Sequence, residues 1–158
     1  MNKQTFLTLL ATFALLFSFT FSCPAKRKAK NVVFIGLDGW GAYSLPKADM
    51  PNVKKLMEDG AYTLKKRSAL PSSSAINWAS MFMGAGPELH GYTEWGSKTP
   101  ELPSRVLNKN GIFPTVFQLL RDARPEAEIG CLYEWEGIKY LVDTLSLSYH
   151  YHVADCNK

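Results

Sequence analysis

Asp38 is the first residue whose type and position suggest chemistry. It directly follows residues 31–37, a continuous apolar run with the length of a fully buried parallel strand. Because ligands of open parallel sheets bind beyond the carboxyl ends of the strands, this carboxylate would be held at the edge where sites form. Carboxylate oxygens there are hard anionic ligands for Zn²⁺ or Mg²⁺. The alternative interpretation is that Asp38-Gly39 only makes a turn.

Ser74 is the second candidate, at the start of a helix predicted over residues 74–83 and next to two further serines. Serines at such a start are good N-caps, but the free N–H groups and the positive helix end also favour phosphate. A serine nucleophile needs a base or a metal, and no histidine-based dyad or triad is evident, so a metal site that includes Asp38 is the simplest source of activation. Asn77 lies near Ser74 on a helix, and its amide is either a donor to a developing charged oxygen or a solvated or capping group.

The elements that must position these residues alternate between strands and helices. This alternation favours an α/β fold with a mainly parallel sheet. The helix over 51–59 has Pro51 in its first turn and Gly60 at the C′ position, and the helix over 114–124 carries one apolar stripe. The predicted order is strand 31–37, helix 51–59, extended segment 61–70, helix 74–83, loop 84–103, turn 110–111, helix 114–124, strand 128–133 and helix 137–147.

The composition limits the class of protein. The 158 residues suffice for one domain, and 46% hydrophobic with 20% charged residues excludes wholesale disorder. The net charge of +4 comes from five basic residues before position 31, because the rest has 13 Lys and Arg against 14 Asp and Glu. A basic face for nucleic acid is therefore not expected, and three cysteines make neither a disulfide scaffold nor a Cys-x-x-Cys zinc site.

The N-terminus resembles an export signal. Lys3 precedes an almost purely apolar run over 6–21, which has the length of a signal-peptide core and is short for a membrane-spanning helix. We expect a signal peptide over 1–22, either of the lipoprotein type with Cys23 as the lipid-anchored residue or cleaved after Ala25, followed by a basic linker over 23–30. The alternative is an uncleaved anchor helix. Each interpretation predicts a periplasmic or membrane-anchored location.

Four segments occur in a fixed order that is similar to a known family. They are VFIGLDG at 33–39, MPNVKKLMEDG at 50–60, LPSSSAIN at 70–77 and MGAGPELHG at 83–91. Together they resemble the start of the alkaline phosphatase superfamily, in particular the type I phosphodiesterase / nucleotide pyrophosphatase group. The resemblance covers roughly residues 31–140. It implies a three-layer α/β/α domain that hydrolyses small-molecule phosphate esters with two divalent metal ions, of the Zn²⁺ type.

The resemblance also implies roles for individual residues. Asp38 would be a metal ligand, Ser74 the metal-bridging nucleophile that forms a covalent phospho-enzyme, and Asn77 a residue that holds the phosphoryl group. Serine stands where the phosphodiesterase branch usually has threonine, and the adjacent Ser72 and Ser73 leave a shift of register open. Trp78 stands where relatives often have histidine. Sulfatases share the fold, but Asn77 replaces their arginine, which argues against sulfate-ester hydrolysis.

The later metal ligands of the superfamily have no counterpart in the sequence. No Asp-His pair occurs, and the only histidines are His90, His150 and His152. Residues 31–158 are therefore expected to be the N-terminal part of the catalytic domain, whose partner would be the C-terminal half. The alternatives are a catalytically incomplete or non-enzymatic remnant, and a phosphomutase or phosphoethanolamine transferase of the same superfamily.

Other residue types have more ordinary interpretations. His150 and His152 would share one face of a strand and form a potential zinc pair, although ordinary surface histidines are the simpler interpretation. Cys131 is expected in the core. The four tryptophans are either core residues or a substrate platform, with Trp78 best placed for the latter because it lies beside Ser74.

Overall fold

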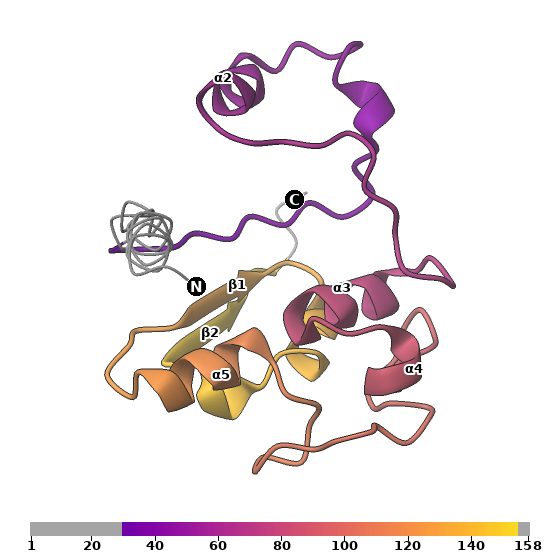
Figure 1. The fold of residues 1–158 in the computed structure, drawn as a ribbon, viewed down its shortest axis with the longest axis vertical. Helices are drawn as coiled ribbons and strands as arrows, with labels where there is room; N and C mark the ends of the chain where they lie inside the picture. The colour runs from indigo at the N-terminus through magenta and orange to yellow at the C-terminus, as the bar shows by residue number, and fades with distance from the viewer. Residues whose placement is uncertain (1–29, 155–158) are drawn as a thin grey trace, which may run out of the picture. The chain divides into compact units, whose positions relative to one another are not determined.

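The computed structural model describes residues 30–154 (Figure 1). The predicted signal peptide over 1–22, Cys23 and the linker up to residue 29 lie outside the described residues. Among residues 30–154, no helix combines the length and the apolar character needed to cross a membrane. The chain divides into two compact units, Met1–Leu37 and Asp38–Lys158.

In the first unit, the strand predicted over residues 31–37 is wrong. The described residues 30–37 are in neither of the strands that the structure assigns, and their side chains are exposed, with Val32 at 85% and Ile35 at 77%. An apolar run favours an extended backbone, but a strand also needs a hydrogen-bonded neighbour, and a local pattern does not specify that neighbour.

The second unit is α/β, as predicted, with a parallel sheet of two strands. The predicted three-layer arrangement is not confirmed by the described residues. The sheet pairs β1 with β2 in a register from Gly130↔Tyr149 to Tyr133↔His152. In chain order the elements are η1 Ala42–Ser44, α2 Pro51–Asp59, α3 Ser74–Met83, α4 Pro87–His90, α5 Val116–Ala123, β1 Gly130–Tyr133, η2 Glu136–Tyr140, η3 Thr144–Ser146 and β2 Tyr149–His152.

The core is built around α3, which packs against α4, α5 and η2 (Figure 1). The helix ends at Gly84, whose φ of 62° suits a residue without a side chain and whose N–H binds the carbonyl of Ser80. The bounds of α3 agree with the prediction over 74–83. The buried apolar residues of this core are Ala75, Ala79, Phe82, Met83, Tyr92, Phe113, Tyr133, Ile138, Leu141 and Val142, with Cys131 packed against them as predicted.

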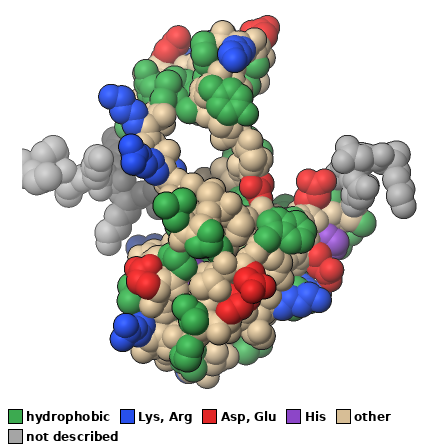
Figure 2. All heavy atoms as spheres, turned by 90° about the vertical axis from the view of Figure 1, so that its right-hand side faces the viewer, with side chains coloured by type: hydrophobic (Ala, Val, Ile, Leu, Met, Phe, Trp, Pro, Cys, Tyr) green, Lys and Arg blue, Asp and Glu red, His purple; other side chains and the backbone are tan. Residues whose placement is uncertain are grey.

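Two helices expose the apolar stripes found in the sequence. The helix α2 has the predicted bounds but no buried residue, and Leu56 is 71% exposed. Gly60 ends it with an extended backbone at φ −132°, so the predicted left-handed C′ glycine is wrong. In α5, Leu119 is 60% exposed, whereas Gln118 is buried. Exposed apolar side chains are also seen in Figure 2, where they lie among acidic and basic side chains on one face of the molecule.

The helix predicted over 137–147 is instead the pair of short 3-10 helices η2 and η3. Asp143 lies between them, and its buried carboxylate accepts hydrogen bonds from the side-chain amides of Asn108 (2.7 Å) and Asn110 (2.9 Å). These partners are more than 30 residues away in sequence. The tertiary contact therefore takes precedence over the local helical preference. The predicted turn at 110–111 is present, with Gly111 at φ 77°.

Arg121 fixes α5 to the two segments that lead into β1 and β2. Its guanidinium donates to the carbonyls of Ser146 (3.1 Å), Pro125 (2.6 Å) and Ala127 (2.8 Å) and to the hydroxyl of Ser148 (2.8 Å). A planar group with five donors can serve four acceptors at once, which a lysine ammonium cannot do in this geometry. This network explains why the polar side of α5 faces inward.

We expect Arg121→Ala to lower the free energy of unfolding by about 2–3 kcal/mol, because three carbonyls lose a charged donor. Arg121→Lys should recover only part of that loss. Urea denaturation of both variants measures the effect, with Arg124→Ala as the matched control, since the exposed Arg124 should stay within about 0.5 kcal/mol of the wild type. Equal midpoints for Arg121→Ala and Arg124→Ala would contradict the structural role.

Candidate functional site

The exposed face of α3 carries the residues predicted to do chemistry. Ser74, Asn77 and Trp78 are partly exposed, whereas Ala75 and Ile76 are fully buried. Residues three and four apart on a helix have neighbouring side chains, so Asn77 and Trp78 both lie beside Ser74. The helix therefore presents a hydroxyl, an amide and an indole together on one surface.

The three neighbouring serines differ in their surroundings. Ser73 occupies the N-cap position, but its hydroxyl makes no capping bond and is buried without a hydrogen-bond partner. Ser74 is the first residue of α3 and is partly exposed, and Ser72 is exposed. A buried hydroxyl is out of reach of a substrate. Of the alternative registers that the sequence leaves open, Ser73 is thus the one that the geometry disfavours.

Asn77 ties α3 to the loop that leads into it. Its Oδ1 accepts from the N–H of Ala69 (2.8 Å), and its Nδ2 donates to the carbonyl of Ser73 (3.0 Å). These bonds brace residues 69–73 and hold the chain just before Ser74 in place. An amide nitrogen carries two hydrogens, so one donor remains beside the serine after the structural bond is made.

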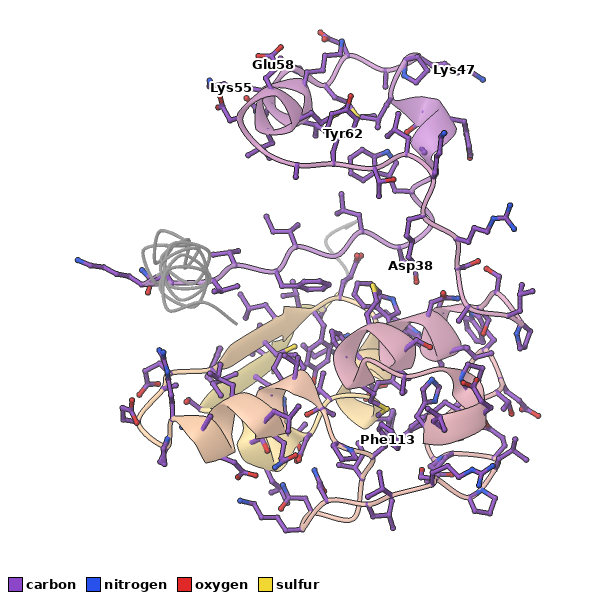
Figure 3. All side chains as sticks on the ribbon, in the orientation of Figure 1. Asp38, Lys47, Lys55, Glu58, Tyr62 and Phe113 are labelled. Carbon is purple, nitrogen blue, oxygen red and sulfur yellow. The ribbon has the colours of Figure 1, made fainter. Side chains whose placement is uncertain are left out.

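Asp38 lies against α3, although it is far from that helix in sequence. Its Oδ1 accepts from the N–H of Gly39 (2.8 Å), and its Oδ2 accepts from the indole Nε1–H of Trp78 (3.2 Å). Figure 3 shows the Asp38 side chain pointing toward α3. The backbone turns at Gly39 with φ 67°, a value that favours glycine. Asp38 therefore takes part in a turn, and its side chain is still free to serve as a ligand, so the two interpretations of this residue are compatible.

The Asp38 carboxylate has the chemistry of one ligand of a divalent cation. Asp38 is exposed and offers carboxylate oxygens that each keep a free lone pair beside the one hydrogen bond described for it. Such oxygens suit Zn²⁺ or Mg²⁺. Among residues 30–154, however, no group of three or more His, Cys, Asp or Glu side chains is placed to hold a metal ion. Asp38 thus fits the chemistry of a single cation ligand, and the described residues do not complete a site of three or more such side chains.

The tryptophans do not gather into one platform. Trp95 is 66% exposed, and its ring lies 6.1 Å from that of Trp135, while its carbonyl accepts from the N–H of Ala75 at the start of α3 (3.4 Å). Trp40 instead donates to the hydroxyl of Ser44 (2.6 Å). The ring of Trp78 stacks on Phe82, with centroids 5.6 Å apart.

His90 has a structural position rather than a free side chain. It is fully buried, its Nδ1 accepts from the N–H of Tyr92 (3.1 Å), and its Nε2 lies 3.1 Å from the Ser80 hydroxyl. Because Nδ1 is an acceptor, the neutral ring carries its proton on Nε2 and donates it to Ser80. Burial lowers the pKa of His90, and the charge of Glu88 opposes that shift. The neutral imidazole thus connects α4 to α3.

The other two histidines lie on β2, on one face of the strand as predicted. His150 Nδ1 is 3.2 Å from the Tyr133 hydroxyl, and His152 Nε2 donates to the carbonyl of Glu134 (2.6 Å). Both imidazoles stack on the ring of Tyr133. Each ring is thus already engaged with the protein.

The sequence identified Trp78 but missed its contact with Asp38. The two residues are 40 positions apart, and no local pattern pairs an indole with a carboxylate at that separation. The signal in the sequence that could have drawn attention to this contact is that Trp78 stands where relatives often have histidine. The single-turn helix α4 was also missed in a predicted loop, although Pro87 at its first position and Gly91 at its end are typical helix signals.

Comparison with known protein families gives a match over the segment that carries these residues. The family described as type I phosphodiesterase / nucleotide pyrophosphatase matches residues 32–113, which is just over half of the chain and includes Asp38, Ser74 and Asn77. The chain belongs to this family of phosphoric-ester hydrolases, within the alkaline phosphatase superfamily. Enzymes of the family are typically metal-dependent. Neither the curated proteins nor the solved structures gave a match to this chain.

Proposed function

We propose that this protein hydrolyses a small-molecule phosphate ester through a covalent phosphoserine at Ser74. The observation that carries the proposal is the hydrogen bond between Trp78 and Asp38. It brings the candidate ligand to the helix that begins with the candidate nucleophile, and Trp78 lies one turn after Ser74 on that helix. The family match over both residues supports the same assignment.

The reaction follows from the groups on α3. The Ser74 oxygen attacks phosphorus, the bond from phosphorus to the leaving oxygen breaks, and the serine proton passes by way of solvent to the departing alkoxide. Asn77 donates its remaining N–H to a phosphoryl oxygen and so stabilises the charge that develops there. Water then cleaves the bond between phosphorus and the serine oxygen. The product is a monoester from a diester, or inorganic phosphate from a monoester.

Divalent metal ions, two Zn²⁺ in this proposal, would be held by Asp38 and Ser74 and by ligands outside the described residues. When bound, such ions favour the alkoxide form of serine and neutralise phosphoryl charge. We further propose that the remaining ligands belong to the C-terminal half of a three-layer α/β/α catalytic domain. Export through the signal peptide over 1–22, with or without a lipid anchor at Cys23, is part of the same proposal, and nucleic acid is not among the proposed partners.

The experiment is to trap the intermediate on the full chain together with the C-terminal half that is proposed to supply the remaining ligands. Purified protein with Zn²⁺ is mixed with bis(p-nitrophenyl) phosphate or p-nitrophenyl phosphate, quenched in acid, digested and analysed by mass spectrometry. We expect Zn²⁺-dependent release of p-nitrophenol and a phosphorylated peptide whose modified residue is Ser74. Absence of both would overturn the proposal in favour of a non-catalytic remnant. Turnover with an unmodified peptide would overturn the covalent mechanism alone.

A further inference from the structure

The hydrogen bond between Trp78 and Asp38 joins a helix of the core to an exposed turn. An indole N–H is a donor only, so the bond over 3.2 Å runs from Trp78 Nε1 to Asp38 Oδ2. Trp78 lies on α3, the central helix of the core, and its ring is stacked on the buried Phe82 with an interplanar angle of 28°. The donor is therefore fixed by the core, whereas the acceptor lies on an exposed turn.

Both oxygens of the Asp38 carboxylate are held by separate donors. Gly39 N–H binds Oδ1 at 2.8 Å, and Trp78 binds Oδ2. Two bonds, one to each oxygen, define the rotation of the carboxylate about its own axis. An exposed carboxylate held only by its neighbour Gly39 would remain free to turn, because neither group would be attached to the core. The bond to the helix removes that freedom before any ligand binds.

We propose that Trp78 is a positioning residue, which orients the Asp38 carboxylate to bind a divalent cation beside Ser74. The inference rests on the proposed function and gives the tryptophan a role through its N–H rather than as a face for substrate. Groups that hydrogen-bond to a metal ligand orient it and tune its basicity, and their loss typically weakens metal binding by roughly 10- to 100-fold. We expect an effect of that size on Zn²⁺ binding when the indole N–H is removed.

The test uses Trp78→Phe in the full chain together with the proposed C-terminal half, so that the remaining ligands are present. Phenylalanine keeps a ring to stack on Phe82 and loses only the N–H donor. The matched control is Trp40→Phe, because Trp40 also donates its indole N–H, but to the Ser44 hydroxyl rather than to a carboxylate. Zn²⁺ titrations by calorimetry should give a dissociation constant roughly 10- to 100-fold weaker for Trp78→Phe and unchanged for Trp40→Phe. Equal constants for Trp78→Phe and the wild type would overturn the positioning role and leave the proposed function intact.

A second measurement does not depend on the folding of Trp78→Phe. Proton–nitrogen NMR spectra of the wild type and of Asp38→Asn are compared. We expect the Trp78 indole resonance to differ in position between the two spectra, because the variant replaces the carboxylate that accepts the indole hydrogen bond. The Trp95 and Trp135 resonances should stay in place. Mn²⁺ should broaden the Trp78 indole signal in the wild type and not in Asp38→Asn. An unmoved Trp78 resonance would refute the contact itself, and no saturable Zn²⁺ binding by the wild type would overturn the metal-dependent function together with the role of Trp78.

Discussion

Ser74→Ala is expected to lower kcat/KM for an aryl phosphate ester by about a thousandfold or more, because the variant lacks the atom that bonds to phosphorus. The trapped phosphopeptide should disappear as well. Ser74 is the first residue of α3 and is partly exposed, so its replacement should leave the unfolding midpoint close to that of the wild type. Steady-state kinetics and urea denaturation of the same preparation separate the two effects.

Ser73→Ala and Ser72→Ala are the controls for register. The Ser73 hydroxyl is buried without a partner, so its removal should be neutral or slightly stabilising and should leave turnover nearly unchanged. Ser72 is exposed, and its replacement should also be silent. Loss of turnover in Ser72→Ala, with Ser74→Ala still active, would transfer the nucleophile to Ser72. Wild-type activity in all three variants would rule out a serine nucleophile at this helix.

His90→Ala is expected to cost about 3 kcal/mol in the free energy of unfolding, the largest stability effect that the described contacts predict for a polar residue. The change empties a fully buried site and leaves the Tyr92 N–H without its acceptor and Ser80 without its neighbour. The ring also packs near those of Tyr92 and Phe113. Urea denaturation measures the loss. His150→Ala, at an exposed histidine, should cost less than about 1 kcal/mol.

The same residue predicts a pH dependence of stability. Burial lowers the pKa of His90 below the ordinary histidine value of 6.5, so near and below that pH the unfolded chain binds more protons than the folded chain. Stability is therefore fully present above about pH 6.5 and falls as the pH drops through the lower pKa of the folded state. We expect the urea midpoint of the wild type to decrease between pH 7.5 and 5.5, and His90→Gln to lose most of that dependence. An equal decrease in both proteins would assign the titration to other groups.

The acidic groups with shifted pKa values act in a different range. Hydrogen bonds from Ser97 and Thr93 lower the pKa of Glu101 against an opposing effect of burial, and Lys109 lowers that of Asp122. The ordinary pKa values of these two carboxyl groups are 4.5 and 3.8, and both are lowered, so their protonation affects stability below the pH window chosen for His90. The comparison between pH 7.5 and 5.5 therefore isolates the histidine from these carboxylates.

Local signals in the sequence were sufficient for several elements. The helix α3 has the predicted bounds because Ser74 follows a proline-containing turn and Gly84 supplies a left-handed end. Pro51 likewise marks the start of α2, and β1 lies within the strand predicted over 128–133, whereas β2 had no predicted strand. The order of the motifs around Asp38, Ser74 and Asn77 was enough to indicate the family. Each of these helices and strands, and each single motif, depends on residues within a few positions of one another.

Only the tertiary structure decided which surfaces are buried and which residues meet. The apolar run over 31–37 and Leu119 are exposed, although their patterns suited a core. Asp143 interrupts a predicted helix because distant asparagines bind it, and Asp38 meets Trp78 across 40 residues. A local pattern states what an element prefers, whereas burial and long-range hydrogen bonds depend on the neighbours that the folded chain supplies. For that reason the sequence by itself determined the candidate residues Asp38 and Ser74, and the fold decided that the Trp78 indole, on the helix that begins with Ser74, binds the Asp38 carboxylate.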